Sequence, residues 1–196
     1  MIYLIGGVSR SGKSVLARRV ADITKCSVIH VDDFVQAGKA GAVEGWDFNS
    51  LTGDHQRAEV LFPLVKSLVQ TALSRSNGVC FEGVSLLPKY LAELKNLNPD
   101  KIKILFMAYP DITPTAKVEQ FELGARLPNN WAAGLDDQQK YDYAAGGIKL
   151  SQAAEKECAT HQVPFISMRL DFDADILKAQ DILGIISRRY EGIDHA

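Results

Sequence analysis

The feature that most constrains the fold is a glycine-rich segment at residues 6–14, GGVSRSGKS, which follows an apolar run and precedes an amphipathic stretch. Gly7, Gly12, Lys13 and Ser14 fit the pattern G-x-x-x-x-G-K-[ST], in which backbone N–H groups form a nest for an anion. Glycine at both positions permits unusual backbone angles and a close approach of phosphate, and the following helix directs its positive end toward the same anion. The sequence therefore predicts a strand, a phosphate-binding loop and a helix in direct succession.

The same pattern predicts the ligands. Lys13 is expected to reach the β- and γ-phosphates of ATP, and Ser14 to offer its hydroxyl to the Mg²⁺ that bridges them. The other residues expected around the nucleotide come from the loop, from the start of its helix and from the second half of the chain: Gly7, Ser9, Arg10, Ser11, Gly12, Val15 and Arg126. A chance match in a glycine-rich turn is the alternative, and the flanking strand and helix patterns argue against it.

Length, composition and charge limit the classes of protein to which this chain can belong. A chain of 196 residues with 46% hydrophobic and 23% charged residues suits a single domain spanning residues 1–196. A net charge of -2 without runs of like charge argues against a nucleic-acid partner. We see no apolar segment of about 18 residues and no basic leader, and therefore expect no membrane association and a cytoplasmic protein. Cys26, Cys80 and Cys158 are odd in number and widely spaced, which predicts buried thiols; the oligomeric state stays open.

The pattern along the chain alternates between strands and helices. Five runs have the length and bounds of buried strands: residues 1–5, 27–31, 78–83, 101–107 and 163–168. Helical stripes lie between them, and Gly146-Gly147 is expected to interrupt one of these helices. Such alternation implies a five-stranded, mostly parallel sheet with helices on both faces, which is the three-layer α/β fold of P-loop NTPases. Residues 35–53 are expected to form a mobile substrate loop, and residues 113–135 a candidate lid.

Two predicted strands end in acids. Asp32 and Asp33 follow the second strand and Glu82 closes the third, and ligands of open parallel sheets bind beyond the carboxyl ends of strands. Asp32 is the candidate general base, with Lys13 and Glu82 as the other catalytic residues. Glu82 together with Ser14 is the expected metal site. The alternatives are a capping role for either aspartate and a buried structural role for Glu82.

Aromatic and basic residues are weaker candidates. Phe34, Trp46 and Phe48, with Asp32 and Asp33, are expected to contact the substrate, although lone aromatic side chains more often belong to a core. Lys117 and Arg126 lie in the candidate lid, where a guanidinium can neutralise charge that develops during phosphoryl transfer. Both are more often surface charges. His30 and His55 lack ligand-spaced partners, so histidine metal binding is not expected.

Residues 26–34, CSVIHVDDF, taken with the phosphate loop and Phe81-Glu82-Gly83, resemble the uridine kinase and nicotinamide riboside kinase group of P-loop kinases. Trp46-Asp47-Phe48 is also similar to that group. The resemblance covers the first half of the chain and implies that Asp32 contacts a sugar hydroxyl and serves as the base, with Glu82 also in the site. The arginine-rich lid of that group is not visible, because Arg126 is the only arginine between Arg75 and Arg169.

Three functions follow as hypotheses. The first is ATP- and Mg²⁺-dependent phosphoryl transfer to a hydroxyl of a small metabolite, which is nucleoside-like by resemblance. The second is a kinase of another metabolite, such as a nucleoside monophosphate or a phosphorylated acid, which requires basic residues in the acceptor pocket. The third is a nucleotide-binding regulator that has no acceptor. The chain has no N-K-x-D guanine motif, which argues against a GTPase switch.

Overall fold

The computed structural model describes residues 1–75, 77–123 and 134–185. Within these ranges the helices and strands alternate in the following order: β1 (Ile2–Gly7), α1 (Lys13–Thr24), β2 (Ser27–His30), α2 (Val31–Lys39), α3 (Asp54–Leu73), β3 (Val79–Gly83), α4 (Pro88–Lys95), β4 (Ile102–Ala108), α5 (Pro114–Leu123), α6 (Asp137–His161), β5 (Phe165–Ser167) and α7 (Phe172–Ile182). The strands form one five-stranded sheet in the order β2-β3-β1-β4-β5, and every pairing is parallel.

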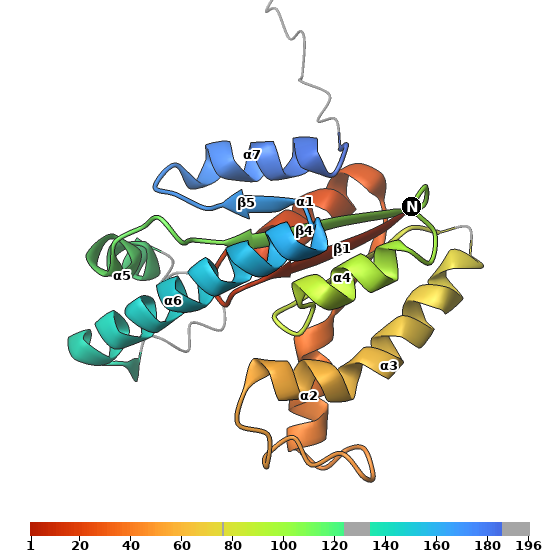
Figure 1. Cartoon of the computed structure of the whole chain (residues 1–196), viewed down its shortest axis with the longest axis horizontal. Helices are drawn as coiled ribbons and strands as arrows, with labels where there is room; N and C mark the ends of the chain where they lie inside the picture. Colours follow the sequence, from red (N-terminus) through yellow and green to blue (C-terminus); the bar gives the residue numbers. More distant parts are fainter. Residues whose placement is uncertain (76, 124–133, 186–196) are drawn as a thin grey trace, which may run out of the picture.

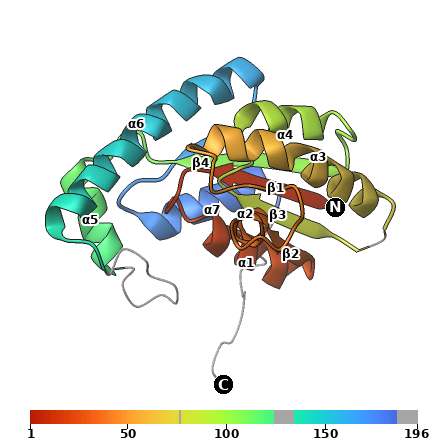
Figure 2. The same cartoon turned by 90° about the horizontal axis from the view of Figure 1, so that it is seen from below.

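Helices cover both faces of this sheet. Figures 1 and 2 show α1 and α7 on one face and α3, α4 and α6 on the other. The strand β1 lies at the centre, between β3 and β4, so the phosphate loop emerges from the middle of the carboxyl edge. The predicted three-layer α/β fold is confirmed.

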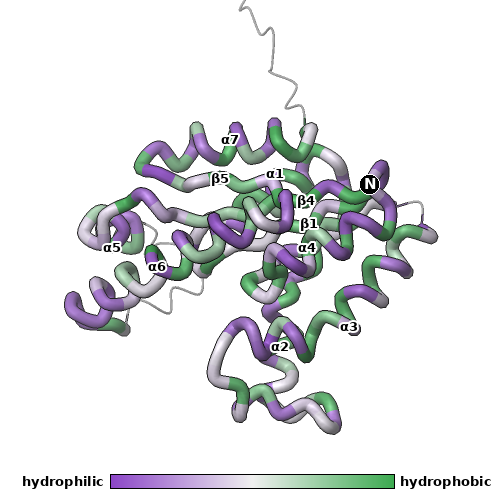
Figure 3. Tube along the Cα trace, viewed as in Figure 1, coloured by the Kyte–Doolittle hydropathy of each residue, from purple (hydrophilic) through white to green (hydrophobic). Residues whose placement is uncertain are grey.

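The core has one layer on each side of the sheet. Along β1, Leu4 packs toward α3, α4 and α6, whereas Ile5 packs toward α1 and α7. Successive side chains of a strand point to opposite faces, and here both faces are covered, which is why β1 is apolar throughout. Figure 3 shows the complementary pattern in the helices, where hydrophilic and hydrophobic positions alternate around α3 and α7. The three cysteines are buried free thiols, as predicted.

The segment after β2 differs from the prediction. Residues 35–53 were expected to be a loop, but α2 begins at Val31 and continues to Lys39, so only residues 40–53 are irregular. Asp32 and Asp33 therefore lie in the first turn of a helix, where carboxylates interact favourably with the helix dipole. This places Asp32 directly beyond the carboxyl end of β2.

The long helix α6 also differs from the prediction. It runs without interruption through Gly146 and Gly147, and a capping box between Asp136 and Gln139 defines its start. Gly147 is required by packing, because a Cβ atom there would lie 2.2 Å from the hydroxyl oxygen of Tyr109. The glycine therefore permits a close helix approach instead of ending the helix. No helix in the described part of the chain is both long and apolar enough to cross a bilayer.

Candidate active site

The phosphate loop adopts the conformation that its glycines predict. Gly7 and Gly12 both have positive φ angles, of 154° and 96°, so glycine is favoured at both positions. Space is also restricted, because a Cβ on Gly7 would lie 2.2 Å from the carbonyl oxygen of Met107, and one on Gly12 would lie 2.7 Å from the ring of Phe172. Gly12 is the N-cap of α1 and makes no side-chain cap, which leaves the first N–H groups of the helix available to an anion.

Two buried polar side chains lie inside this loop. Lys13 is buried and its Nζ donates a hydrogen bond to the carbonyl oxygen of Val8 at 2.9 Å. Burial lowers the pKa of Lys13, and the nearby carboxylates of Asp32 and Glu82 oppose that shift. The hydroxyl of Ser11 is buried and has no hydrogen-bond partner among the described residues. A buried cation and an unused hydroxyl fit a loop that receives phosphate oxygens.

Glu82 joins the phosphate loop to β2. Its Oε1 accepts a hydrogen bond from the hydroxyl of Ser14 at 2.9 Å and lies 2.5 Å from Nδ1 of His30. The parallel register pairs His30 with Glu82, so the two side chains meet at the ends of adjacent strands. Sequence reasoning missed His30, and the signal that would have found it is this pairing of β2 with β3.

The described residues hold no group of three or more His, Cys, Asp or Glu side chains arranged to bind a metal by themselves. Magnesium usually takes only one or two protein oxygens and completes its shell with water and substrate phosphates. The oxygens of Ser14 and Glu82 fit that requirement, since they are hydrogen-bonded to each other at the edge of the phosphate loop.

Asp32 faces the same edge from the start of α2. Its Oδ1 accepts a hydrogen bond from the backbone N–H of Val84 at 3.0 Å, which fixes the carboxyl group beside the end of β3. Burial raises the pKa of Asp32, and the Lys13 ammonium opposes this shift. Asp33, the next residue, is exposed.

The predicted aromatic substrate contacts are not gathered at the loop. Phe48 is fully buried and packs over Gly38 in the core, where a Cβ on Gly38 would lie 2.0 Å from its ring. Trp46 packs edge-on against Phe48 at 5.3 Å between ring centroids, and Phe34 is half-buried against the same core. Phe48 is therefore a core residue. It packs the irregular segment 40–53 against α2. Arg126 and most of the candidate lid beyond α5 lie outside the described residues.

Two side chains from outside the loop hold its tip. The hydroxyl of Tyr109, which follows β4, donates to the carbonyl oxygen of Ser9 at 3.0 Å. Nζ of Lys117, on α5, donates to the next carbonyl, that of Arg10, at 3.0 Å, and lies 3.9 Å from the centroid of the Tyr109 ring. The expectation that Lys117 is a surface charge was wrong, since its side chain is buried. Burial, together with the neighbouring charges of Arg10 and Lys13, lowers its pKa to about 7.

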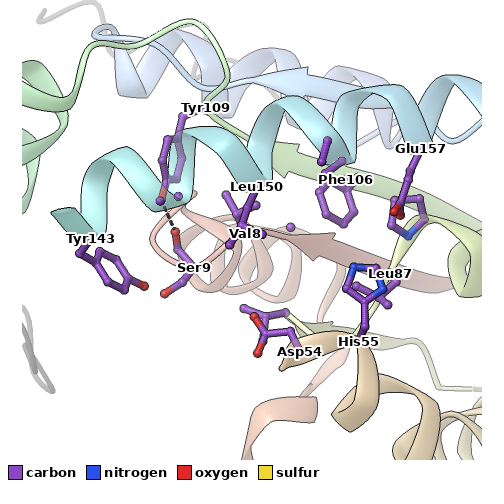
Figure 4. Close-up of a pocket in the computed structure, with 17 residues that line it drawn as sticks. Val8, Ser9, Asp54, His55, Leu87, Phe106, Tyr109, Tyr143, Leu150 and Glu157 are labelled. Carbon is purple, nitrogen blue, oxygen red and sulfur yellow. Dashed lines mark hydrogen bonds between the residues drawn. The ribbon is translucent and has the colours of Figure 1, made fainter. Parts of the chain in front are cut away.

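A cavity of about 300 Å³ opens beside the loop (Figure 4). Its walls come from the end of β1 and the loop, from the first turn of α3, from the segment between β3 and the start of α4, from β4 and the residue after it, and from α6. The lining residues are Gly7, Val8, Ser9, Asp54, His55, Val84, Leu87, Pro88, Phe106, Tyr109, Tyr143, Gly146, Gly147, Leu150, Ala153, Ala154 and Glu157. The backbone N–H of Val84, a lining residue, donates a hydrogen bond to Asp32. The candidate base therefore lies one hydrogen bond from the wall of the cavity. Asp54, Tyr143 and Glu157 were not predicted, because only the tertiary fold brings α3 and α6 to the loop.

Comparisons with known proteins agree with this fold. Shikimate kinase from Bacteroides thetaiotaomicron is similar over 94% of this chain and 98% of that protein, with a TM-score of 0.54 at 14% identity. A gluconokinase from Sinorhizobium meliloti matches over 93% of this chain and 90% of its own, with a TM-score of 0.52 at 14% identity. Shikimate kinase from Acinetobacter baumannii, solved in complex with shikimate, gives 0.52 at 18% identity and coverages of 93% and 92%. No protein-family model and no curated protein sequence matches.

These likenesses extend over nearly the whole chain and support the three-layer α/β fold. Likenesses at 14–18% identity describe the fold alone. The phosphate loop, the acids beside it and the adjoining cavity are the features that bear on chemistry.

Proposed function

We propose that this protein is an ATP- and Mg²⁺-dependent kinase that transfers the γ-phosphoryl group to a hydroxyl of a small metabolite. The observation that carries the proposal is the meeting of Lys13, Ser14, Asp32 and Glu82 at one edge of the sheet, beside a cavity that borders the phosphate loop. Each of these side chains supplies a function that phosphoryl transfer requires, and the cavity supplies room for an acceptor.

In the proposed reaction the acceptor oxygen bonds to the γ-phosphorus of ATP, and the bond from that phosphorus to the bridging oxygen of ADP breaks. Asp32 orients the hydroxyl and takes its proton, and its raised pKa brings the carboxylate nearer to the pH at which a base is most effective. Lys13 and the N–H groups of the loop neutralise the phosphates. Mg²⁺ held at Ser14 and Glu82 would supply further neutralisation of the phosphate oxygens.

The acceptor is proposed to be nucleoside-like, from the resemblance of the first half of the chain to the uridine kinase and nicotinamide riboside kinase group. A nucleoside monophosphate or another phosphorylated acceptor is disfavoured, because no lysine or arginine occurs among the described residues that line the cavity. A regulator without an acceptor is also disfavoured, because Asp32 and the cavity would then have no role. Residues 40–53, the irregular part of the expected substrate loop, are proposed as the segment that closes over the acceptor.

A turnover screen tests this function. The full chain is incubated with ATP, Mg²⁺ and a panel of ribonucleosides, sugars and hydroxy acids, and ADP release is measured. We expect stimulation by at least one hydroxyl compound, and a fall in its kcat of about 10²–10⁴ in Asp32→Asn, which keeps the shape of the side chain but removes the base. Lys13→Ala is expected to weaken ATP binding as well. ATP binding without stimulation by any acceptor would favour the regulator.

A further inference from the structure

We propose that the cavity beside the phosphate loop takes a cationic acceptor, with its hydroxyl at the loop end, an apolar body in the middle and a protonated amine bound by Glu157. This inference rests on the proposed function and specifies its substrate class. It depends on the shape of the cavity, on the chemistry of its walls and on the distribution of charge along it.

The cavity is elongated along α6. The helix contributes residues at intervals of three or four, which all lie on one face: Tyr143, Gly146, Gly147, Leu150, Ala153, Ala154 and Glu157. At 1.5 Å per residue, Tyr143 and Glu157 are about 21 Å apart along the helix axis. Figure 4 shows Ser9 and Tyr143 at one end of the cavity and Glu157 at the other. A ligand that spans it is longer than it is wide.

The middle of the cavity is apolar. Val8 and Leu150 lie between the two ends in Figure 4, and Leu87 and Phe106 continue the apolar wall toward Glu157. The glycines and alanines of α6 make room for the ligand because they carry little or no side chain. Such a wall stabilises a hydrocarbon or ring body by removing its surface from water.

The charged groups of the cavity are acidic. Its described ionisable residues are Asp54, His55, Tyr109, Tyr143 and Glu157, with no lysine or arginine among them. Asp54 already has a cationic partner, since its Oδ1 lies 3.3 Å from Nη1 of Arg57. Glu157 is half-buried and makes no hydrogen bond or ion pair with any other described residue. A carboxylate in that position pairs best with a protonated amine and repels an anion.

The two ends of the cavity therefore differ in chemistry. The loop end offers the carboxylate of Asp54 and, one hydrogen bond beyond Val84, that of Asp32, and a hydroxyl can donate to either acid. The far end offers the Glu157 carboxylate from α6, with the His55 imidazole from α3 on the same side of the cavity (Figure 4). A compound with a hydroxyl at one end and an amine at the other satisfies both, whereas a hydroxy acid places its carboxylate against Glu157.

Binding of three chain-length-matched probes tests the inference. Aminododecanol, dodecanediol and hydroxydodecanoate have chains long enough to extend along most of the cavity, and they differ only in the charge of one end. Calorimetry on the full chain is expected to give the tightest binding for aminododecanol, at least about tenfold tighter than for dodecanediol, and the weakest for hydroxydodecanoate. Glu157→Gln should abolish the preference for the amine. Glu155→Gln, an exposed acid on the same helix that does not line the cavity, should retain it.

Several outcomes would overturn the inference: equal binding of the amine and the diol, a preference unchanged in Glu157→Gln, or no binding of any probe. ADP release measured with the same compounds separates the two proposals. If a neutral or anionic acceptor turns over and the amine does not bind, the kinase assignment stands and the cationic class fails. If the amine binds through Glu157 and no acceptor of any class is phosphorylated, the kinase assignment fails and the cation site stands.

Discussion

Two adjacent glycines of α6 provide a matched pair that tests the packing behind the phosphate loop. Gly147 lies against Tyr109, and a Cβ atom there would be 2.2 Å from the phenol oxygen and 3.1 Å from the carbon that bears it. A Cβ on Gly146 would meet nothing within 4 Å. Both glycines lie in the same helix, so alanine gains the same helix propensity at each, about 1 kcal/mol.

Gly147→Ala must displace Tyr109, which is buried and held beneath Lys117. Overpacking of this kind costs about 1–3 kcal/mol, and loss of the hydrogen bond from Tyr109 to Ser9 adds about 1 kcal/mol. Because the propensity gain cancels between the two variants, we expect Gly147→Ala to be less stable than Gly146→Ala by about 2–4 kcal/mol. For a chain of this length that corresponds to roughly 4–16 °C in Tm.

Thermal and urea unfolding of the two variants and the parent measure this difference. Gly146→Ala should equal or exceed the parent in stability, and Gly147→Ala should fall below it and bind ATP more weakly, since the tip of the loop has lost a support. Equal stabilisation by both substitutions would refute the argument, because it would mean that Tyr109 is not held against Gly147.

The remaining predictions concern Lys117 and Phe48. The unfolded chain restores the ordinary pKa of Lys117 while the folded chain keeps it at about 7, so between these values the unfolded state binds more protons and stability rises with pH. Urea unfolding from pH 7 to pH 9 should show the parent gaining about 2 kcal/mol relative to Lys117→Met; parallel curves would show that Lys117 titrates normally. Phe48→Ala should cost about 3–5 kcal/mol in the same assay, whereas a loss of acceptor affinity at unchanged stability would restore Phe48 to the substrate site.

The residues that the first half of the chain contributes to the candidate site could be predicted from the sequence, because the signals for them are local. The phosphate loop depends on glycines and a helix start within a few residues, and Gly7 and Gly12 take the positive φ angles that such a loop requires. Asp32 and Glu82 were found because each follows a short buried strand, and parallel strands bring their carboxyl ends to one edge. The order of the five strands followed from their short apolar runs, whereas α2 was not predicted.

Other features depended on contacts between residues that are far apart in the chain. No sequence pattern near Lys117 indicates that its amine reaches the carbonyl of Arg10. No pattern near Glu157 indicates that α6 lies along the cavity. Gly147 looked like a helix breaker because its local propensity is poor, and the packing of Tyr109 against it decided otherwise. Sequence alone determined the layers of the fold and the conformation of the phosphate loop, because both depend on near neighbours. Only the tertiary structure decided what supports that loop and what lines the cavity, because α3, α5 and α6 reach it through long-range packing.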